Sequence, residues 1–454
     1  MDKKIIPKRD TYIVLITSLI FILSCILLKI SLAYGFIAGI VLSFYIFEKR
    51  GYEPRNLIKM MWDGLIECRM IFVLLILIAT TISIWLSSGI VPAMIYYGFE
   101  YMKGMNFLFA AFIITSIISI FMGTAFGTIS TIGLALLGLG KGFGIPVHIL
   151  LAAIISGAFI ADKISPLSAL LNLTLTTTNI RYREALKSML VTLIPTYILS
   201  ALFYFFIGRG YSITVDVSNL DSYKMAIKEG FFISPLLLLL PVLILVMSIL
   251  GAKIIPTITL GSVVGIIISL TLQDLELINI VKAIFVGYRG TTASPELNEI
   301  LISGGIVSMI EVIFIVMGVV ALNSLFEGTR IIQPIIDNMI YRVKSKKELV
   351  FMTGILSSIL TIVSCDQTVG IILPGRLLRN KYDELGVDHS ILARTISDTG
   401  TIIAPLMPWN VNALFIYVIA GVSAISYAPY AVFCYLSPII TFTIFSLHKS
   451  KNKE

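Results

Sequence analysis

Charged residues, cysteines and histidines are scarce in this sequence. Only 13% of the 454 residues are charged, whereas about a quarter are charged in soluble domains. The chain is therefore not an ordinary soluble protein. Its four cysteines, Cys25, Cys68, Cys365 and Cys434, are far apart and form neither a CxxC pair nor a disulfide framework. The three histidines are equally scattered, which argues against a histidine-based metal centre.

Catalytic signatures are also missing. The chain contains no Walker A motif, no GxSxG and no HExxH. ATP-driven transport, acyl-transfer chemistry and zinc-dependent proteolysis therefore have no candidate residues. We expect no enzymatic activity, no cofactor and no bound metal other than a transported cation.

Long apolar stretches dominate the sequence. Hydrophobic residues make up 57% of the chain, and the mean hydropathy is +0.97. These values predict a polytopic membrane protein in a lipid bilayer. The net charge of +8 comes from basic residues in short connections between apolar runs. This pattern indicates membrane topology rather than nucleic-acid binding. The basic first ten residues precede an apolar run without a cleavage site, so we expect an uncleaved first helix and a cytoplasmic N-terminus.

Runs long enough to cross a bilayer predict an all-α membrane protein with about 10–12 transmembrane helices in two repeats. The predicted spans are residues 11–30, 31–47, 70–90, 107–140, 147–179, 188–208, 234–250, 254–272, 300–323, 349–364, 391–420 and 427–447. Residues 275–288 are shorter and are expected to be re-entrant. We expect a first half at 1–210, a connecting loop at 211–233 and a second half at 234–454. Further connections are predicted at 48–69 and 91–106, and an amphipathic surface segment at 327–348.

The stretch SGAFIADKISPLSALLN, residues 156–172, places charges and a proline inside an apolar segment. Asp162, Lys163 and Pro166 would interrupt a membrane helix. Such a break is tolerated in lipid only where the opened backbone lines a polar cavity. Asp162 could bind a proton or a cation, and Lys163 could attract an anion. The alternative is a structural ion pair between two helices.

A related patch occurs near the C-terminus, in SDTGTIIAPLMPWN at residues 397–410. Asp398 and Pro405-Leu406 correspond in our interpretation to Asp162 and Pro166-Leu167. Each patch follows a Gly/Thr/Ser-rich break, GTAFGTISTIG at 123–133 and SCDQTVGI at 364–371. Paired interruptions in two halves predict a secondary transporter with a site near the middle of the membrane. Whether the repeats are parallel or inverted is left open.

Oxygen-bearing side chains cluster at these breaks and suit a small cation, although a small-residue packing seam would look similar. A proton and a cation competing for Asp162 and Asp398 would be sufficient for antiport. The residues expected to bind the ion or solute are Asp162, Ser165, Ser168, Asn172, Thr124, Thr128, Asp366, Asp398, Thr399, Thr401 and Asn410.

Three other charged residues lie in or beside apolar segments. Glu311, in the predicted span 300–323, either faces the bundle interior as a proton carrier or bonds to a neighbouring helix. Arg376 and Arg394 flank the second-half breaks. We interpret both arginines as topology residues that reach the membrane surface.

Five ordered segments resemble the NhaC family of sodium/proton antiporters, which includes a malate/lactate exchanger. They are SSGIVPAMIYYG (87–98), GTAFGTISTIG (123–133), SGAFIADKISPLS (156–168), DQTVGIILPGR (366–376) and SDTGTIIAPLMPWN (397–410). The resemblance implies a multi-pass carrier of a prokaryotic plasma membrane with two repeats and alternating access. It also implies site roles for Asp162, Ser165, Pro166, Ser168, Asn172, Asp366 and Asp398. A homodimer is compatible with this interpretation.

One position departs from the family pattern. The family usually has PLSDxxN, whereas this chain has PLSALLN, with Ala169 in place of the aspartate. A carboxylate that would help to bind sodium is therefore missing. The main hypothesis is a sodium/proton antiporter. The alternative is a proton- or sodium-coupled carrier of a malate- or lactate-like carboxylate or an amino acid. A channel or a membrane scaffold belongs to a different class and would show no coupled, saturable flux.

Overall fold

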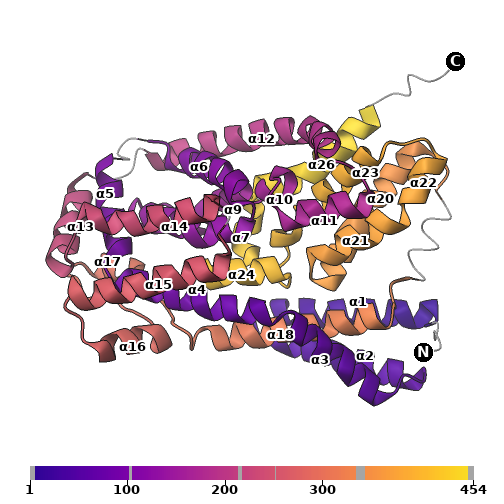
Figure 1. The fold of residues 1–454 in the computed structure, drawn as a ribbon, viewed down its shortest axis with the longest axis horizontal. Coiled ribbons are helices and arrows are strands. Elements are labelled where there is room, and N and C mark those ends of the chain that lie inside the picture. Colours follow the sequence, from indigo (N-terminus) through magenta and orange to yellow (C-terminus); the bar gives the residue numbers. More distant parts are fainter. Residues whose placement is uncertain (1–5, 102–104, 213–216, 251, 334–342, 448–454) are drawn as a thin grey trace.

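The computed structural model describes residues 6–101, 105–212, 217–250, 252–333 and 343–447. Within these ranges the chain is helical, and its only strand-like pairing is a single bridge between Arg289 and Ile302. Most helices run roughly along the long axis of the molecule (Figure 1). The first residues of α1 and the last residues of α26 lie at the same end of that axis. This confirms the all-α fold class.

The first half begins with a hairpin of two apolar helices and continues into broken helices. Its elements are α1 (Lys8–Leu27), α2 (Leu32–Lys49), α3 (Pro54–Glu67), α4 (Arg69–Ser87), α5 (Ile90–Tyr101), α6 (Phe107–Met122), α7 (Ala125–Thr128), the π-helix η1 (Ile129–Gly133), α8 (Leu134–Gly142), α9 (Val147–Ala158), α10 (Ala161–Ile164), α11 (Ala169–Thr178) and α12 (Tyr182–Ser212).

The second half has a comparable order of elements. They are α13 (Val217–Gly230), η2 (Pro235–Leu238), α14 (Leu239–Ile249), α15 (Ile254–Thr271), α16 (Leu277–Val286), α17 (Pro295–Ile300), α18 (Met309–Gly328), α20 (Lys346–Ser364), α21 (Gln367–Leu377), α22 (Arg379–Glu384), α23 (His389–Ile396), the π-helix η3 (Ser397–Thr401), η4 (Ala404–Leu406), α24 (Val411–Ala420), α25 (Ala424–Tyr427), η5 (Ala428–Tyr430) and α26 (Val432–Leu447).

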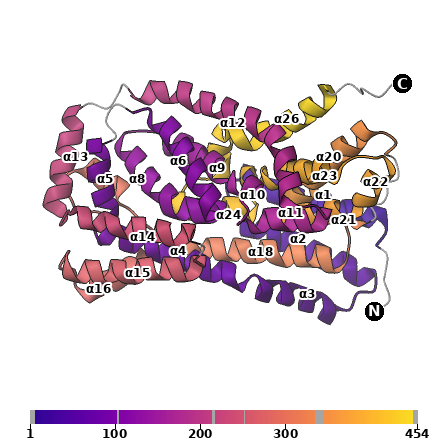
Figure 2. The same cartoon turned by 45° about the horizontal axis from the view of Figure 1, so that its top comes forward.

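Among the described residues, eight helices are long and apolar enough to cross a membrane, or up to eleven if each bent pair counts as one span. Helix α9 lies in the middle of the molecule (Figures 1 and 2). All its residues from Ile149 to Ala158 are buried, as expected of a helix that is apolar on every side. It packs against α6. The broken segment α10–α11 follows it directly along the chain.

Several connections predicted from sequence are helical in the structure. Residues 48–69 include α3, which packs along α18 and carries charges on one side, and residues 91–106 include most of α5. The sequence predicted connections there without predicting helices, because charge and turn residues do not distinguish a loop from an amphipathic helix. The predicted connecting loop 211–233 likewise contains α13. Much of the surface segment expected at 327–348 lies outside the described residues.

The first breaks of the two halves share one backbone conformation. Helix α6 ends at Gly123 (φ 70°) and α20 ends at Cys365 (φ 59°), both left-handed. The next residues, Thr124 (φ −151°) and Asp366 (φ −141°), are extended, and a new helix follows each. The corresponding residues are 242 positions apart in both cases.

The second breaks keep the same spacing of 242 residues. Ser168 and Asn410 are both extended N-caps, and the helices that follow them, α11 and α24, each have ten residues. This spacing pairs Pro166 with Pro408. It also pairs Asp398 with Ser156, and Ala404 with Asp162. Our sequence-based pairing of Asp162 with Asp398 was therefore wrong. It compared residue types, whereas the equivalent backbone conformations of the two halves lie 242 residues apart.

The corresponding helices run in opposite directions. Helix α12 ends at the end of the molecule where α5 and α13 lie, whereas α26 ends at the opposite end of the long axis, the end at which α1 begins (Figure 1). In Figure 2 the two helices keep these directions. Repeats related by an axis in the membrane plane place equivalent helices in opposite directions.

Candidate functional site

Two broken segments of the first half cross next to Asp162. The hydroxyl of Ser165 donates to the carbonyl oxygen of Ile120, at 2.6 Å. The hydroxyl of Ser168 donates to Asp162 Oδ1, at 3.2 Å, and accepts from the backbone N–H of Leu171. The backbone N–H of Ala125 also donates to Asp162. These contacts place a carboxylate where α7 and α11 both begin.

Asp162 is buried, with 6% of its surface exposed. Across the described residues, no lysine, arginine or histidine forms an ion pair with it. A carboxylate removed from water is strongly destabilised unless a proton, a cation or a charged side chain compensates its charge. Its direct neighbours are a hydroxyl and a backbone N–H, so the position is suited to an exchangeable proton or cation.

The close approach of the two helix breaks of the first half depends on Gly123. This residue has φ 70°, and a Cβ atom placed on it would lie 2.5 Å from Leu167 Cβ and 2.9 Å from the backbone carbon of Leu167. Only glycine allows both the left-handed conformation and this close approach. The first residue of the sequence motif GTAFG must therefore be glycine for the two breaks to pack together.

We predict that Gly123→Ala destabilises the protein by about 2 kcal/mol or more, because left-handed backbone costs about 1–2 kcal/mol for alanine and Leu167 must also move. Gly144→Ala is the matched control, since Gly144 has φ 68° but nothing lies within 4 Å of its added Cβ. Unfolding in detergent by heat or SDS would measure both. Equal destabilisation of the two variants would contradict the importance of the Leu167 contact.

A second centre contains a fully buried ion pair between Lys163 and Asp398. Both side chains are 0% exposed. Asp398 also accepts hydrogen bonds from the hydroxyls of Thr192 at 2.7 Å, Ser437 at 3.1 Å and Thr441 at 2.5 Å. Four elements far apart in sequence (α10, α12, η3 and α26) therefore meet at one carboxylate. Because its charge is already compensated, Asp398 differs from Asp162.

Arg394 lies one helical turn before Asp398 and is also buried, at 6% exposure. Its positive charge acts on both members of the ion pair. Our interpretation of Arg394 as a residue that reaches the membrane surface was wrong, because α23 packs against α12, α20 and α21. Arg376, in contrast, is exposed.

The two breaks of the second half are joined by a network of amides. Gln367 donates to the carbonyl oxygen of Thr401 at 2.6 Å, and Asn412 donates to Gln367 at 3.1 Å and to Asn410 at 2.8 Å. The backbone N–H of Val411 donates to the carbonyl oxygen of Cys365 at 3.1 Å. The discontinuities that follow α20 and η4 therefore lie side by side.

Buried polar atoms without a hydrogen-bond partner concentrate in this region. Among the described side chains they include Thr361 Oγ1, Arg394 Nε, Ser397 Oγ, Thr401 Oγ1 and Asn410 Nδ2. Buried polar groups normally have partners, so such a concentration indicates a site for water, ions or a solute. The π-helix η3, which carries Asp398, is a form of backbone that often occurs at functional sites.

A large cavity, here called the open cavity, reaches Asp366. Its volume is about 820 Å³. Its wall includes residues of α3, α18 and α21, among them Glu67, Glu327, Arg330 and Arg376. Asp366 itself caps α21 and accepts from the backbone N–H of Thr368 at 3.2 Å. Of the predicted carboxylates, Asp366 is therefore the one in contact with a large cavity.

The remaining predicted residues lie at or near the breaks in different ways. Thr128 and Thr399 are buried and donate to backbone carbonyl oxygens of their own helices, those of Thr124 and Thr395. Asn172 is exposed and donates to the carbonyl oxygens of Pro166 and Ser168. Ala169, at the first position of α11, is exposed as well.

Glu311 does not occupy the mid-span position that we expected. Helix α18 begins at Met309 rather than near residue 300, so Glu311 lies in its first turn and is exposed. Its role as a proton carrier stays a prediction.

Sequence reasoning missed the hydroxyl groups around Asp398. Thr192, Ser437 and Thr441 lie in the long apolar helices α12 and α26, where single hydroxyl residues are common. The available signal was the spacing of Thr192, Thr196 and Ser200, which places three buried hydroxyls on one helix face.

Comparison with known proteins agrees with these features. The sequence model described as the Na⁺/H⁺ antiporter family matches residues 162–448, a range that contains Asp162, Asp366 and Asp398. An NhaC Na⁺/H⁺ antiporter of Alkalihalophilus pseudofirmus is 30% identical over 84% of this chain and 82% of its own length.

The chain belongs to the Na⁺/H⁺ antiporter family.

Other relatives of this antiporter-family protein have different names. The malate-2H⁺/Na⁺-lactate antiporter of Bacillus subtilis is 28% identical over 84% of the chain and 81% of its own length. The arginine/ornithine antiporter ArcD of Halobacterium salinarum is 28% identical over 83% of the chain and 78% of its own length. The resemblance to the NhaC family is thus confirmed, and the protein is a multi-pass membrane transporter.

Proposed function

We propose that this protein exchanges Na⁺ for H⁺ across a prokaryotic plasma membrane as a secondary active transporter. The observation that carries the proposal is the buried carboxylate of Asp162, which lies between two helix breaks and forms no ion pair with any described residue. Membership of the Na⁺/H⁺ antiporter family supports the choice of ions.

In this proposal a proton and a sodium ion occupy Asp162 alternately. Either one neutralises the carboxylate, so binding of one requires release of the other. Oxygen atoms of Ser165, Ser168 and Thr124 lie at the same breaks and would complete the shell around sodium, which prefers hard oxygen ligands. Exchange of one monovalent cation for another leaves the charge of the site unchanged, so the rest of the protein needs no compensating movement of charge.

We assign a structural role to the ion pair between Lys163 and Asp398. Lys163 follows Asp162 directly and reaches Asp398 in the other half of the chain. The pair therefore holds the broken segments of both halves together beside the exchange site. Asp366, at the floor of the open cavity, would guide cations toward this region. As part of the same proposal, Thr401, Asn410 and the other predicted site residues keep the ion-binding or solute-binding roles given to them from sequence.

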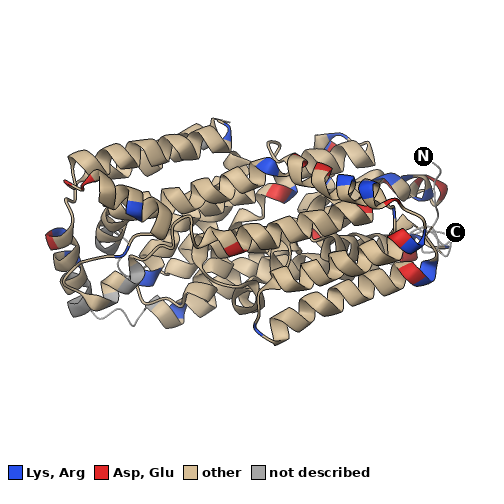
Figure 3. Cartoon of the chain, turned by 90° about the horizontal axis from the view of Figure 1, so that it is seen from below, with Lys and Arg blue, Asp and Glu red and all other residues tan. Residues whose placement is uncertain are grey.

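The end of the molecule that carries both termini is assigned to the cytoplasm. Charged residues gather there, as Figure 3 shows. The C-terminal end of α2 and helix α22, which contribute Lys49, Arg379 and Lys381, lie at that end in Figure 1. An excess of lysine and arginine marks cytoplasmic segments. The open cavity would then face the cytoplasm.

A second candidate is exchange of an organic solute. The open cavity is large enough for a small carboxylate or an amino acid, and its wall carries both Arg376 and Asp366. Relatives named for malate and lactate or for arginine and ornithine support this alternative, as does Ala169 in place of the family carboxylate.

Purified protein in liposomes with an internal pH dye tests the two candidates. Sodium added outside is expected to cause saturable proton release from the lumen, whereas potassium and protein-free liposomes give none. A response to malate, lactate or arginine without a response to sodium would contradict sodium/proton exchange and establish the organic carrier.

A further inference from the structure

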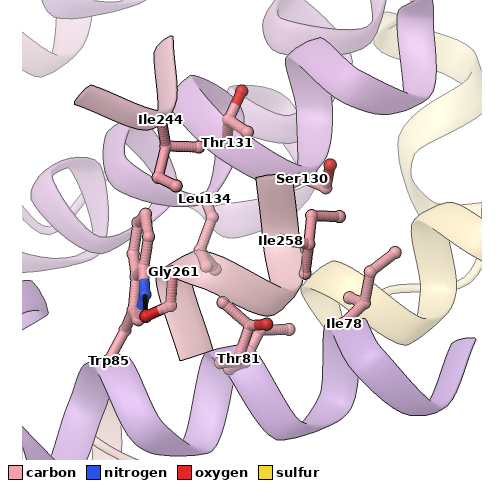
Figure 4. Close-up of a pocket in the computed structure, with 10 residues that line it drawn as sticks. Ile78, Thr81, Trp85, Ser130, Thr131, Leu134, Ile244, Ile258 and Gly261 are labelled. Atoms are coloured by element: carbon pink, nitrogen blue, oxygen red, sulfur yellow. Dashed lines mark hydrogen bonds between the residues drawn. The ribbon is translucent and has the colours of Figure 1, made fainter. Parts of the chain in front are cut away.

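A second, small cavity shares no lining residue with the open cavity. Its volume is about 10 Å³, which is room for one water molecule at most. Ser130, Thr131 and Leu134 of η1 and α8 form one wall, and residues of α4, α14 and α15 form the rest (Figure 4). No solute fits in this space as it stands.

The small cavity corresponds to the open cavity by position. Its residues Ser130, Thr131 and Leu134 are 242 positions before Ile372, Leu373 and Arg376, which line the open cavity. This is the spacing that relates the two sets of helix breaks.

The helices facing these walls correspond as well. Left-handed Gly89 follows α4 and left-handed Arg330 follows α18, 241 positions later. With that spacing, Ile78, Ile82 and Trp85 in the small cavity match Val319, Asn323 and Phe326 in the open one. Six of the ten residues drawn in Figure 4 therefore have counterparts in the open cavity.

We infer that the small cavity is the second entrance to the transport site, closed in this structure, and that α14 and α15 are the elements that cover it. Two cavities at equivalent positions in oppositely directed halves are the two ends of one path. One is about 820 Å³ and the other about 10 Å³, as alternating access requires of a carrier that is open to one side.

The covering elements are identified by their contacts. Helix α14 packs against η1, and its residue Ile244 lines the small cavity. Helix α15 is tied to α4 by the Trp85 Nε1–H, which donates to the carbonyl oxygen of Gly261 at 3.3 Å, and by a hydrogen bond of 2.6 Å between the hydroxyls of Thr81 and Ser262. Among the described residues, none from the α1–α2 hairpin lines the open cavity.

The lining of this entrance indicates which kind of solute it admits, an argument that rests on the proposed function. None of the ten residues drawn in Figure 4 is charged, whereas the open cavity carries five charged side chains. Thr81, Ser130 and Thr131 supply hydroxyl groups. Hydroxyl oxygens are hard ligands of the kind that a small cation prefers, so the entrance suits a hydrated sodium ion, and it offers an organic anion no positive charge. Ile82 and Leu134, in place of Asn323 and Arg376, would exclude water when it is closed.

Thiol labelling tests the entrance directly. In a variant with the four native cysteines replaced and exchange retained, Thr368→Cys reports on the open cavity and Ser130→Cys on the small one. We expect a membrane-impermeant reagent to modify them from opposite sides of oriented vesicles, and a solute gradient that slows one reaction to accelerate the other. Modification of Ser130→Cys from the same side as Thr368→Cys, or from neither side, would overturn the inference.

Cross-linking tests the covering elements. Joining Ser130→Cys to Ile244→Cys with a cleavable bifunctional reagent is expected to stop transport, and cleavage is expected to restore it. Each single-cysteine variant treated with the same reagent is the control. Undiminished transport by the fully cross-linked protein would overturn the inference. A carrier of an organic solute would fail the sodium test and still show the labelling pattern with its own substrate, so the two failures are distinguishable.

Discussion

Asp162→Asn is expected to abolish sodium-dependent proton movement and to leave the protein folded. Asparagine has nearly the same shape, and its side-chain oxygen can still accept from Ser168 and from the backbone N–H of Ala125. It cannot take up a proton or balance the charge of a cation. Because a buried charge without its partner costs several kcal/mol and 1.4 kcal/mol is tenfold in affinity, sodium binding should weaken by more than about 100-fold.

The measurement is proton flux in liposomes over a range of sodium concentrations, with thermal unfolding of the same preparation in detergent. Asp383→Asn is the matched control, since this carboxylate lies on the surface and pairs with the half-buried His389, and ion pairs at the surface contribute little. It should exchange sodium as the unmodified protein does. Undiminished exchange by Asp162→Asn would move the exchange site elsewhere, with Asp366 as the next carboxylate to test.

Breaking the buried pair should have the largest effect on stability. Lys163→Met leaves Asp398 without its cation, and Asp398→Asn leaves Lys163 without its anion, in a site where both side chains are fully buried. Each single substitution should cost about 3–5 kcal/mol. The double variant Lys163→Met/Asp398→Asn removes both charges. It should be more stable than either single variant because no uncompensated charge stays buried, and the asparagine oxygen can still accept hydrogen bonds from Thr192 and Thr441, which both donate to Asp398 Oδ2.

A double-mutant cycle measured by SDS unfolding gives the coupling between the two side chains. Additive effects of the two substitutions would show that the residues are not paired. Flux measurements on the double variant then separate the two roles proposed for the site. We expect it to retain sodium-dependent proton movement at a reduced rate. Complete loss of exchange in a stably folded double variant would assign Asp398 to ion binding, as the sequence alone suggested.

The helix breaks could be predicted from sequence because their causes are local. Gly123 adopts a left-handed backbone, Pro166 has no N–H to donate, and Ser168 caps the next helix. These are properties of single residues and their near neighbours. The same reasoning placed the second-half breaks near Asp366 and Asn410, although the first of them proved only two residues long.

Partnerships between the halves could not be predicted in the same way. Asp162 and Asp398 looked alike because each is an acid near a proline in an apolar segment. Their surroundings differ because α10, α12 and α26 bring a lysine and three hydroxyls to Asp398, and no ion-pair partner to Asp162 among the described residues. Arg394 was misjudged for a similar reason, since its burial depends on helices that contact α23 from distant parts of the chain.

By itself the sequence determined that this protein is an all-α membrane transporter with two interrupted halves, because hydropathy and helix-breaking residues act over one or two helical turns. Only the tertiary structure decided which charges are compensated and which cavity is open. Those properties depend on the packing of segments about 200 residues apart, such as Thr192 against Asp398, and on the opposite directions of α12 and α26.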